Sequence, residues 1–302
     1  MKQSYSNVEE RQRHVSEASR RLVQDEKNLL VQQLRRIEEI NCKVAAQGRD
    51  VIAVGSFQAL IDLSTDMTWL NYAVPIEPLG TKAEVAEVLL ELREVFTERD
   101  RTLRFEFTES LWPTLPELLE QAGLQLEARQ PMMLCTPTEF QPYHASGVQV
   151  QLLTAADSTD TLETYLSVRN QGFNYHAAEP PTENEIAELQ EQIQTGRMRC
   201  ALANLDGIPA GVGITMPMSG ICELVGVATA PAWRRRGVAA TLCSFLVNDH
   251  FKGGGDLVWL SAGDAIAEAT YERIGFKKAD SRLNYIHQKK DVSKAARQHG
   301  AG

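Results

Sequence analysis

Residues 227–240 read Val-Ala-Thr-Ala-Pro-Ala-Trp-Arg-Arg-Arg-Gly-Val-Ala-Ala and join an expected strand, 221–229, to an expected helix, 238–251. The backbone amides in the first turn of a helix have no acceptor within the helix and carry the positive end of its dipole. A glycine and small residues here let an anionic ligand approach those amides. The stretch therefore predicts an anion-binding turn suited to a pyrophosphate. It has neither the Gly-Lys-Ser/Thr of a Walker loop nor the spaced glycines of a dinucleotide-binding turn.

Strands and helices alternate on both sides of this turn. The other strands expected in the second half are 148–153, 200–205, 210–216, 257–261 and 283–287, and the helices are 184–195, 265–274 and one opened by Thr154 to Asp157. Asp206-Gly207 predicts a hairpin, because Asp-Gly suits the positive φ angles of a tight turn. The second half therefore predicts an α/β domain with a mixed sheet (α+β).

The turn resembles the acetyl-CoA loop of the GNAT superfamily of N-acetyltransferases, Gln/Arg-x-x-Gly-x-Gly/Ala, which here spans 234–239. The family's Val-x-Pro-like strand end is matched at 229–231. Its Asn-x-x-Ala-x-x-x-Tyr helix followed by Gly-Phe is matched at 264–276, with Asp264 in place of the asparagine. The resemblance covers about 148–288. It implies an N-acetyltransferase that moves an acetyl group from acetyl-CoA to a primary amine by direct attack, with no metal.

The resemblance also implies roles for single positions. Val227 and Thr229 would offer backbone groups to the pantetheine arm, and the amides from Arg235 through Ala240 would hold the pyrophosphate. The implied cofactor-binding residues are Val227, Ala228, Thr229, Arg234, Arg235, Arg236, Gly237, Val238, Ala239, Ala240, Asp264 and Ala267.

Two residues are implied to act in catalysis. Tyr271 matches the tyrosine that protonates the departing thiolate, although a helix tyrosine packed on the sheet is the alternative. A base is needed because only a deprotonated amine attacks a thioester. The resemblance implies Glu223, which lies eleven residues before Arg234, where some members of the superfamily carry a base glutamate. An outward-facing strand carboxylate is the alternative for Glu223. Tyr175, His176 and Glu179, in the expected substrate loop, are further candidates for the base.

The first half can be aligned with the second at an offset of 152 residues. Gly123 then falls on Gly275, and the strand expected at 103–107 falls just ahead of 257–261. No glycine lies opposite Gly237. The alignment predicts a degenerate GNAT-like domain that lacks the cofactor loop, and coincidence between two α/β segments is the alternative. The first-half strands expected are 51–54, 68–74, 103–107 and 124–135, and the helices are 82–96 and 116–122.

The first 47 residues predict a helix, with capping-box spacing at Ser6 and Glu9 and a stop at Gly48. Its apolar residues recur every seven positions, which indicates packing against the same chain or a coiled-coil homodimer. The expected organisation is a helical segment 1–48, a degenerate domain 49–145, a catalytic domain 146–290 and a loose tail 291–302, so tandem GNAT-like domains follow an N-terminal helix.

The amino-acid composition indicates a globular protein and disfavours some classes of partner. Of 302 residues, 43% are hydrophobic and 24% charged, which is typical of a globular chain. The net charge of −9 disfavours nucleic acid and anionic membranes as partners. Scattered cysteines and the lack of a long apolar run lead us to expect a cytoplasmic protein. The resemblance implies that its substrate is a small-molecule or peptide amine. A non-catalytic acyl-CoA-binding regulatory module is the alternative, and a nucleotide-phosphate binder is a weaker one.

Overall fold

The computed structural model describes residues 2–175 and 179–287 of the chain. It opens with helix α1 (Lys2–Ala45). The first half then holds β1 (Asp50–Val54), β2 (Phe57–Ile61), β3 (Tyr72–Pro75), α2 (Lys82–Glu98), β4 (Arg104–Thr108), α3 (Leu115–Gln121) and β5 (Leu124–Cys135). The second half holds β6 (Val148–Leu152), α4 (Thr159–Phe173), α5 (Glu183–Gln194), β7 (Arg199–Leu205), β8 (Ile208–Met218), β9 (Ile221–Thr229), α6 (Val238–Lys252), β10 (Leu257–Ser261), α7 (Ala265–Glu272) and β11 (Lys277–His287).

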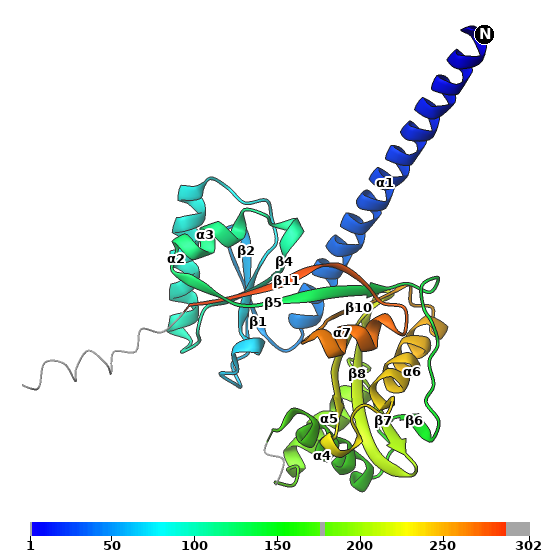
Figure 1. Cartoon of the computed structure of the whole chain (residues 1–302). Coiled ribbons are helices and arrows are strands. Elements are labelled where there is room, and N and C mark those ends of the chain that lie inside the picture. The colour runs from blue at the N-terminus through cyan, green and yellow to red at the C-terminus, as the bar shows by residue number, and fades with distance from the viewer. Residues whose placement is uncertain (1, 176–178, 288–302) are drawn as a thin grey trace, which may run out of the picture.

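The described strands form one eleven-stranded sheet that passes through both halves. Its order is β1-β2-β3-β4-β11-β5-β10-β9-β8-β7-β6. Each half therefore places its last strand in the other: β11 lies between β4 and β5, and β5 lies between β11 and β10. In Figure 1, β5 and β11 run side by side across the middle of the molecule. The sheet is mixed, as the sequence predicted, and the exchange joins the two halves.

The two exchanged strands are related by the repeat of 152 residues. Lys277 pairs with Leu134, and the offset turns this pair into Gln125 and Ile286, which also pair. Gly123 and Gly275, which follow α3 and α7, both have left-handed backbones, with φ of +85° and +101°. The element order and the pairing therefore repeat together, which confirms the predicted tandem fold.

Successive residues of β9 point to opposite faces of the sheet, as in any strand. Cys222 and Leu224 pack in a core cluster with α6, whereas Ile221 packs in a cluster with α1. By this alternation, Glu223 lies on the α1 face. Helices α4 and α5 cover the same face further along the second half, over Leu202 and its neighbours on β7 and β8.

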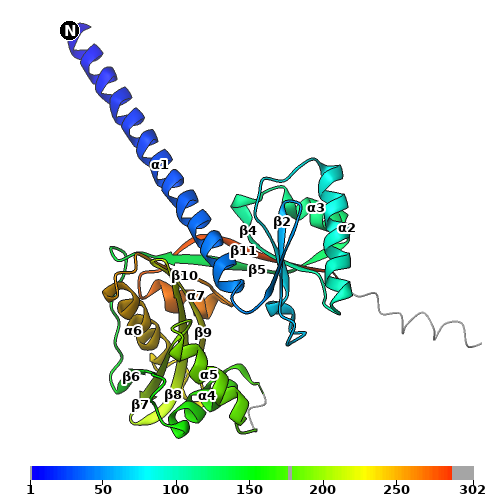
Figure 2. The same cartoon turned by 180° about the vertical axis from the view of Figure 1, so that it is seen from behind.

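Helix α1 packs on the body of the chain over part of its length. Leu34, Ile37 and Ile40 are buried against the sheet, whereas Val23 and Leu29 are 51% and 56% exposed. The N-terminal part of the helix projects away from the sheet in both views (Figures 1 and 2). The apolar stripe therefore packs on its own chain at its C-terminal end.

Four local expectations differ from the structure. Helix α1 begins at Lys2, so Ser6 lies inside it, because no proline or glycine interrupts its first turn. Helix α4 begins after Ser158, whose hydroxyl accepts from the Thr161 amide, whereas Asp157 closes a turn with Thr154. The sequence analysis missed β2. The expected strand 68–74 is a 3-10 turn (68–70) followed by β3.

Two expectations fall on residues that are not described: the tail at 291–302 and the side chain of His176. Within the described ranges, no helix is both long enough and apolar enough to cross a lipid bilayer.

Candidate functional site

The parallel strands β9 and β10 separate in the middle of the second half. They pair only from Ile221 opposite Leu257 to Glu223 opposite Trp259, although β9 continues to Thr229. On its other side, β10 pairs with β5 from Val258 to Ser261. A register shift at Gly226, which has φ of +59°, bends β9 here. The backbone of β9 past Glu223 therefore has an edge toward β10 that is open to a ligand.

The N-terminus of α6 follows directly from this open strand. Gly237 is the N-cap, has φ of +79°, and makes no side-chain capping bond. The first helical hydrogen bond runs from the Thr241 amide to the Gly237 carbonyl at 3.0 Å. The amides of Val238, Ala239 and Ala240 come before this bond and have no acceptor within the helix, so they form the kind of end that binds anions.

Gly237 is required by its conformation and by its surroundings. Its positive φ is costly for a residue with a side chain, and a Cβ added there would lie 2.6 Å from the Ala145 Cβ. The turn before α6 therefore depends on glycine whether or not a ligand is bound.

In the first half, the helix that matches α6 is α2, and its N-terminus is capped. The Thr81 hydroxyl accepts from the Glu84 amide, and the Glu84 carboxylate accepts from the Thr81 amide at 2.7 Å. These hydrogen bonds lower the pKa of Glu84. A capping box and a negative charge thus occupy the end of α2, where α6 leaves its amides open.

Two arginines of the turn, Arg234 and Arg236, contact other parts of the chain. Arg234 Nε donates to the Thr229 carbonyl at 3.1 Å, and its Nη2 donates to the Gly172 carbonyl at 2.9 Å. Arg236 lies over the Trp233 ring and pairs with Asp206 at 3.5 Å. Arg234 therefore braces the turn against β9 and the end of α4.

Arg235 lies in the turn with φ of +61°, and the remaining predicted cofactor residues lie on β9 and at the start of α7. Val227 packs toward α6, and Ala228 packs toward α4. The Thr229 hydroxyl is buried without a hydrogen-bond partner among the described residues. Asp264 is the N-cap of α7, and its carboxylate accepts from the amides of Ile266 and Ala267 at 2.9 and 2.8 Å. The residue that replaces the family's asparagine thus has a structural role in this chain.

Tyr271 and Glu223 lie on opposite faces of the sheet. Tyr271, on α7, is 9% exposed and packs in the α6-side cluster beside Phe276. Burial raises the pKa of its phenol well above the usual value, so Tyr271 keeps its proton at neutral pH. Glu223 is half-buried on the α1 face, at the last paired position before β9 and β10 separate.

The environment of Glu223 favours its protonated form. Burial raises the pKa of the carboxyl to about 8, the carboxylates of Glu106 and Glu38 contribute to the rise, and the Arg282 guanidinium opposes it. A carboxylate with such a pKa is a stronger base than an ordinary glutamate.

The other candidates for the base lie in the segment between α4 and α5. Tyr175 is 52% exposed and stacks on Phe173, with ring centroids 5.4 Å apart. Glu179 lies before α5 in the same segment.

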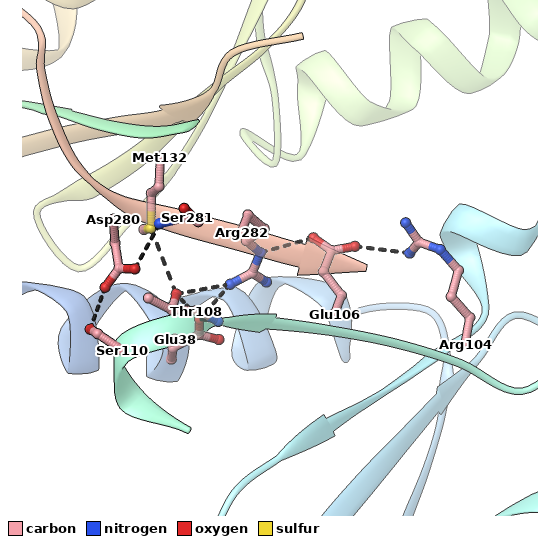
Figure 3. Close-up of polar contacts among 9 residues, drawn as sticks. All are labelled: Glu38, Arg104, Glu106, Thr108, Ser110, Met132, Asp280, Ser281 and Arg282. Carbon is pink, nitrogen blue, oxygen red and sulfur yellow. Dashed lines mark hydrogen bonds and ion pairs between the residues drawn. The ribbon is translucent and has the colours of Figure 1, made fainter. Parts of the chain in front are cut away.

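A buried ion network on the α1 face was not predicted (Figure 3). Arg282 of β11 is 2% exposed, donates from Nε to Glu106 of β4 at 3.1 Å, and pairs through Nη1 with Glu38 of α1. Arg104 bridges Glu106 and Glu127, at 3.0 and 2.6 Å. The alternation of charged residues with phenylalanine in β4 indicated a polar face, but the partners come from distant segments.

Comparison with known proteins points to a family for the part of the chain that contains the α6 turn. The model of the acetyltransferase (GNAT) family matches residues 167–276. Residues 167–276 are thus similar to a GNAT domain. The matched range runs from α4 to the start of β11 and includes β9, the turn at Gly237 and Tyr271.

Similar proteins are found by sequence and by structure. The [ribosomal protein bS18]-alanine N-acetyltransferase of Escherichia coli (strain K12) is 33% identical over 82 residues, which cover 26% of this chain and 55% of that protein. The chain thus spans about half the length of this curated relative. A GCN5-related N-acetyltransferase from Kribbella flavida has a TM-score of 0.72 at 23% identity, over 86% of this chain and 98% of that one. A tandem GNAT protein from the clavulanic acid biosynthesis pathway has a TM-score of 0.53 at 14% identity, over 78% and 79%.

Proposed function

We propose that the chain is an N-acetyltransferase that transfers an acetyl group from acetyl-CoA to a primary amine. The observation that supports this most directly is the open amide end of α6 beside the free edge of β9. The N-terminus of α6 suits an anionic pyrophosphate, and the edge of β9 suits a chain that carries amide groups. Coenzyme A has both a pyrophosphate and an amide-bearing arm.

The residues present fit this cosubstrate. The amides of Val238, Ala239 and Ala240 would hold the pyrophosphate, and the β9 backbone past Glu223 would bind the pantetheine arm. The buried and unpartnered Thr229 hydroxyl lies at the end of this strand. When bound, acetyl-CoA supplies an acetyl group activated as a thioester. The capped end of α2 predicts no second site in the first half.

The two catalytic roles are those of a base and an acid. The ionised form of Glu223, whose share grows as pH approaches about 8, accepts the proton of the substrate ammonium, either directly or through water, and thereby frees the lone pair for attack. Tyr271, whose phenol is protonated at neutral pH, donates a proton to the leaving thiolate. The two residues lie on opposite faces of the sheet, which keeps base and acid apart.

The acceptor is proposed only as a class, an amine of a small molecule or a peptide. The Escherichia coli relative is named for the alanine of a ribosomal protein, which makes a peptide N-terminus one member of the panel to be tested.

The decisive experiment combines binding and turnover. Isothermal titration with acetyl-CoA, CoA and ATP should show binding of the first two alone, and a panel of amines assayed by CoA release should include an accepted substrate. If acetyl-CoA binds and no amine is acetylated, the chain is an acyl-CoA-binding regulatory module. If acetyl-CoA does not bind, the assignment of the α6 turn is wrong.

A further inference from the structure

The ion network of Figure 3 brings together three parts of the chain that are far apart in sequence. Glu38 belongs to the N-terminal helix, Glu106 to the first half, and Arg282 to the last strand. The strand exchange places Arg282 beside Glu106, because β11 pairs with β4. In this pairing Arg282 lies opposite Thr108, two residues along β4 from Glu106. The network therefore exists only because β11 of the second half lies inside the sheet of the first.

The network continues toward Glu223 along the α1 face of the sheet. The Arg282 guanidinium lies over the Trp259 ring, 5.6 Å from its centroid. Trp259 on β10 is the register partner of Glu223 on β9. The remaining neighbour in the sheet, Met216 on β8, is uncharged. The charged groups that act on Glu223 are thus Glu106 from β4, Glu38 from α1 and Arg282 from β11.

We propose that Glu38, Glu106 and Arg282 are positioning residues for acetyl transfer, and that they set how strongly the Glu223 carboxylate holds a proton. The inference rests on the proposed role of Glu223 as the base. It assigns a task to the parts of the chain that lack a cofactor loop, since α1 and the first half supply the charges that tune the base of the second half.

The direction of each effect follows from charge. A carboxylate near Glu223 disfavours its ionised form, and a guanidinium favours it. Loss of Glu38 removes one repelling charge and leaves the opposing charge of Arg282 in place. The proton affinity of Glu223 therefore falls, and loss of Glu106 acts in the same direction.

The test measures the titration of Glu223 directly. The full chain is labelled with [δ-¹³C]glutamate, and the Glu223 signal is assigned by its disappearance in Glu223→Gln. In Glu38→Gln and in Glu106→Gln, the pKa of Glu223 should fall by about half a unit or more. Each variant leaves Arg282 paired with its other carboxylate partner.

Glu39→Gln is the matched control. It removes the same charge from the next residue of the same helix, but Glu39 is exposed and pairs with Lys43 at 2.6 Å. The titration of Glu223 should not change in this variant. If Glu38→Gln and Glu106→Gln also leave it unchanged, the proposal is wrong, whatever the activity.

Turnover on an accepted amine gives the second measurement. The ascending limb of kcat/KM against pH should move to lower pH in Glu38→Gln and Glu106→Gln by as much as the titration moves. If the titration moves and the limb does not, Glu223 is not the base, and the positioning role is refuted together with that part of the proposed function. The two failures are therefore distinguishable.

Discussion

Replacing Glu223 by glutamine should stabilise the protein increasingly as pH rises. In the unfolded chain the carboxyl ionises near its ordinary pKa of 4.5, whereas in the folded chain its pKa is about 8. The folded state therefore retains a proton that the unfolded state releases, and its stability falls as pH rises from about 4.5 to about 8. Between pH 5 and pH 7.5 this linkage amounts to about 3 kcal/mol. Glutamine does not titrate and avoids this loss.

Thermal unfolding at the two pH values measures the effect. With about 2 °C per kcal/mol for a chain of this size, the Tm of Glu223→Gln relative to the parent should rise by about 6 °C from pH 5 to pH 7.5. Glu39→Gln should show the opposite sign, because hydrogen bonding to Lys43 lowers the pKa of Glu39. A Tm difference for Glu223→Gln that is the same at both pH values would refute the protonated, buried state of Glu223.

The remaining predictions concern binding and turnover. Ala239→Glu should keep the Tm of the parent, because a carboxylate suits the first turn of a helix. It should nevertheless lower CoA affinity at least about tenfold, or about 1.4 kcal/mol. Ala239→Ser is the control, and unchanged CoA affinity for Ala239→Glu would contradict the assignment of the α6 turn as the pyrophosphate site. Calorimetric titration should give one CoA per chain, and two would place a second site in the first half. Tyr271→Phe should bind CoA normally and lose about 10²–10⁴-fold in kcat; full kcat from pH 6 to 9 would exclude it as the acid. The rate defect of Glu223→Gln should shrink as pH rises above about 8, where Glu223 of the parent is already ionised while the share of deprotonated amine still grows, and a defect that stays constant above pH 8 would move the base to the loop at 172–182.

Local signals in the sequence were sufficient for most elements and for the turn. Strands β5, β9 and β10 have the bounds that the apolar pattern predicted, and Asp206-Gly207 forms the predicted hairpin with both residues at positive φ. The open end of α6 could be predicted because it depends on Gly237 and the small residues around it. These features are decided by side chains within a few positions of one another, which is why they are visible in sequence.

Only the tertiary structure decided how the two halves share strands and which charges surround Glu223. The exchange of β5 and β11 follows from pairing between strands about 150 residues apart, and the spacing of apolar residues is the same whichever partner a strand takes. Likewise, β10 leaves β9 after Trp259 but stays paired with β5 as far as Ser261, which no local pattern in either strand indicates. The charges around Glu223 come from α1, β4 and β11, so the proton affinity of Glu223 is a property of the assembled sheet, because electrostatic interactions depend on distance in space.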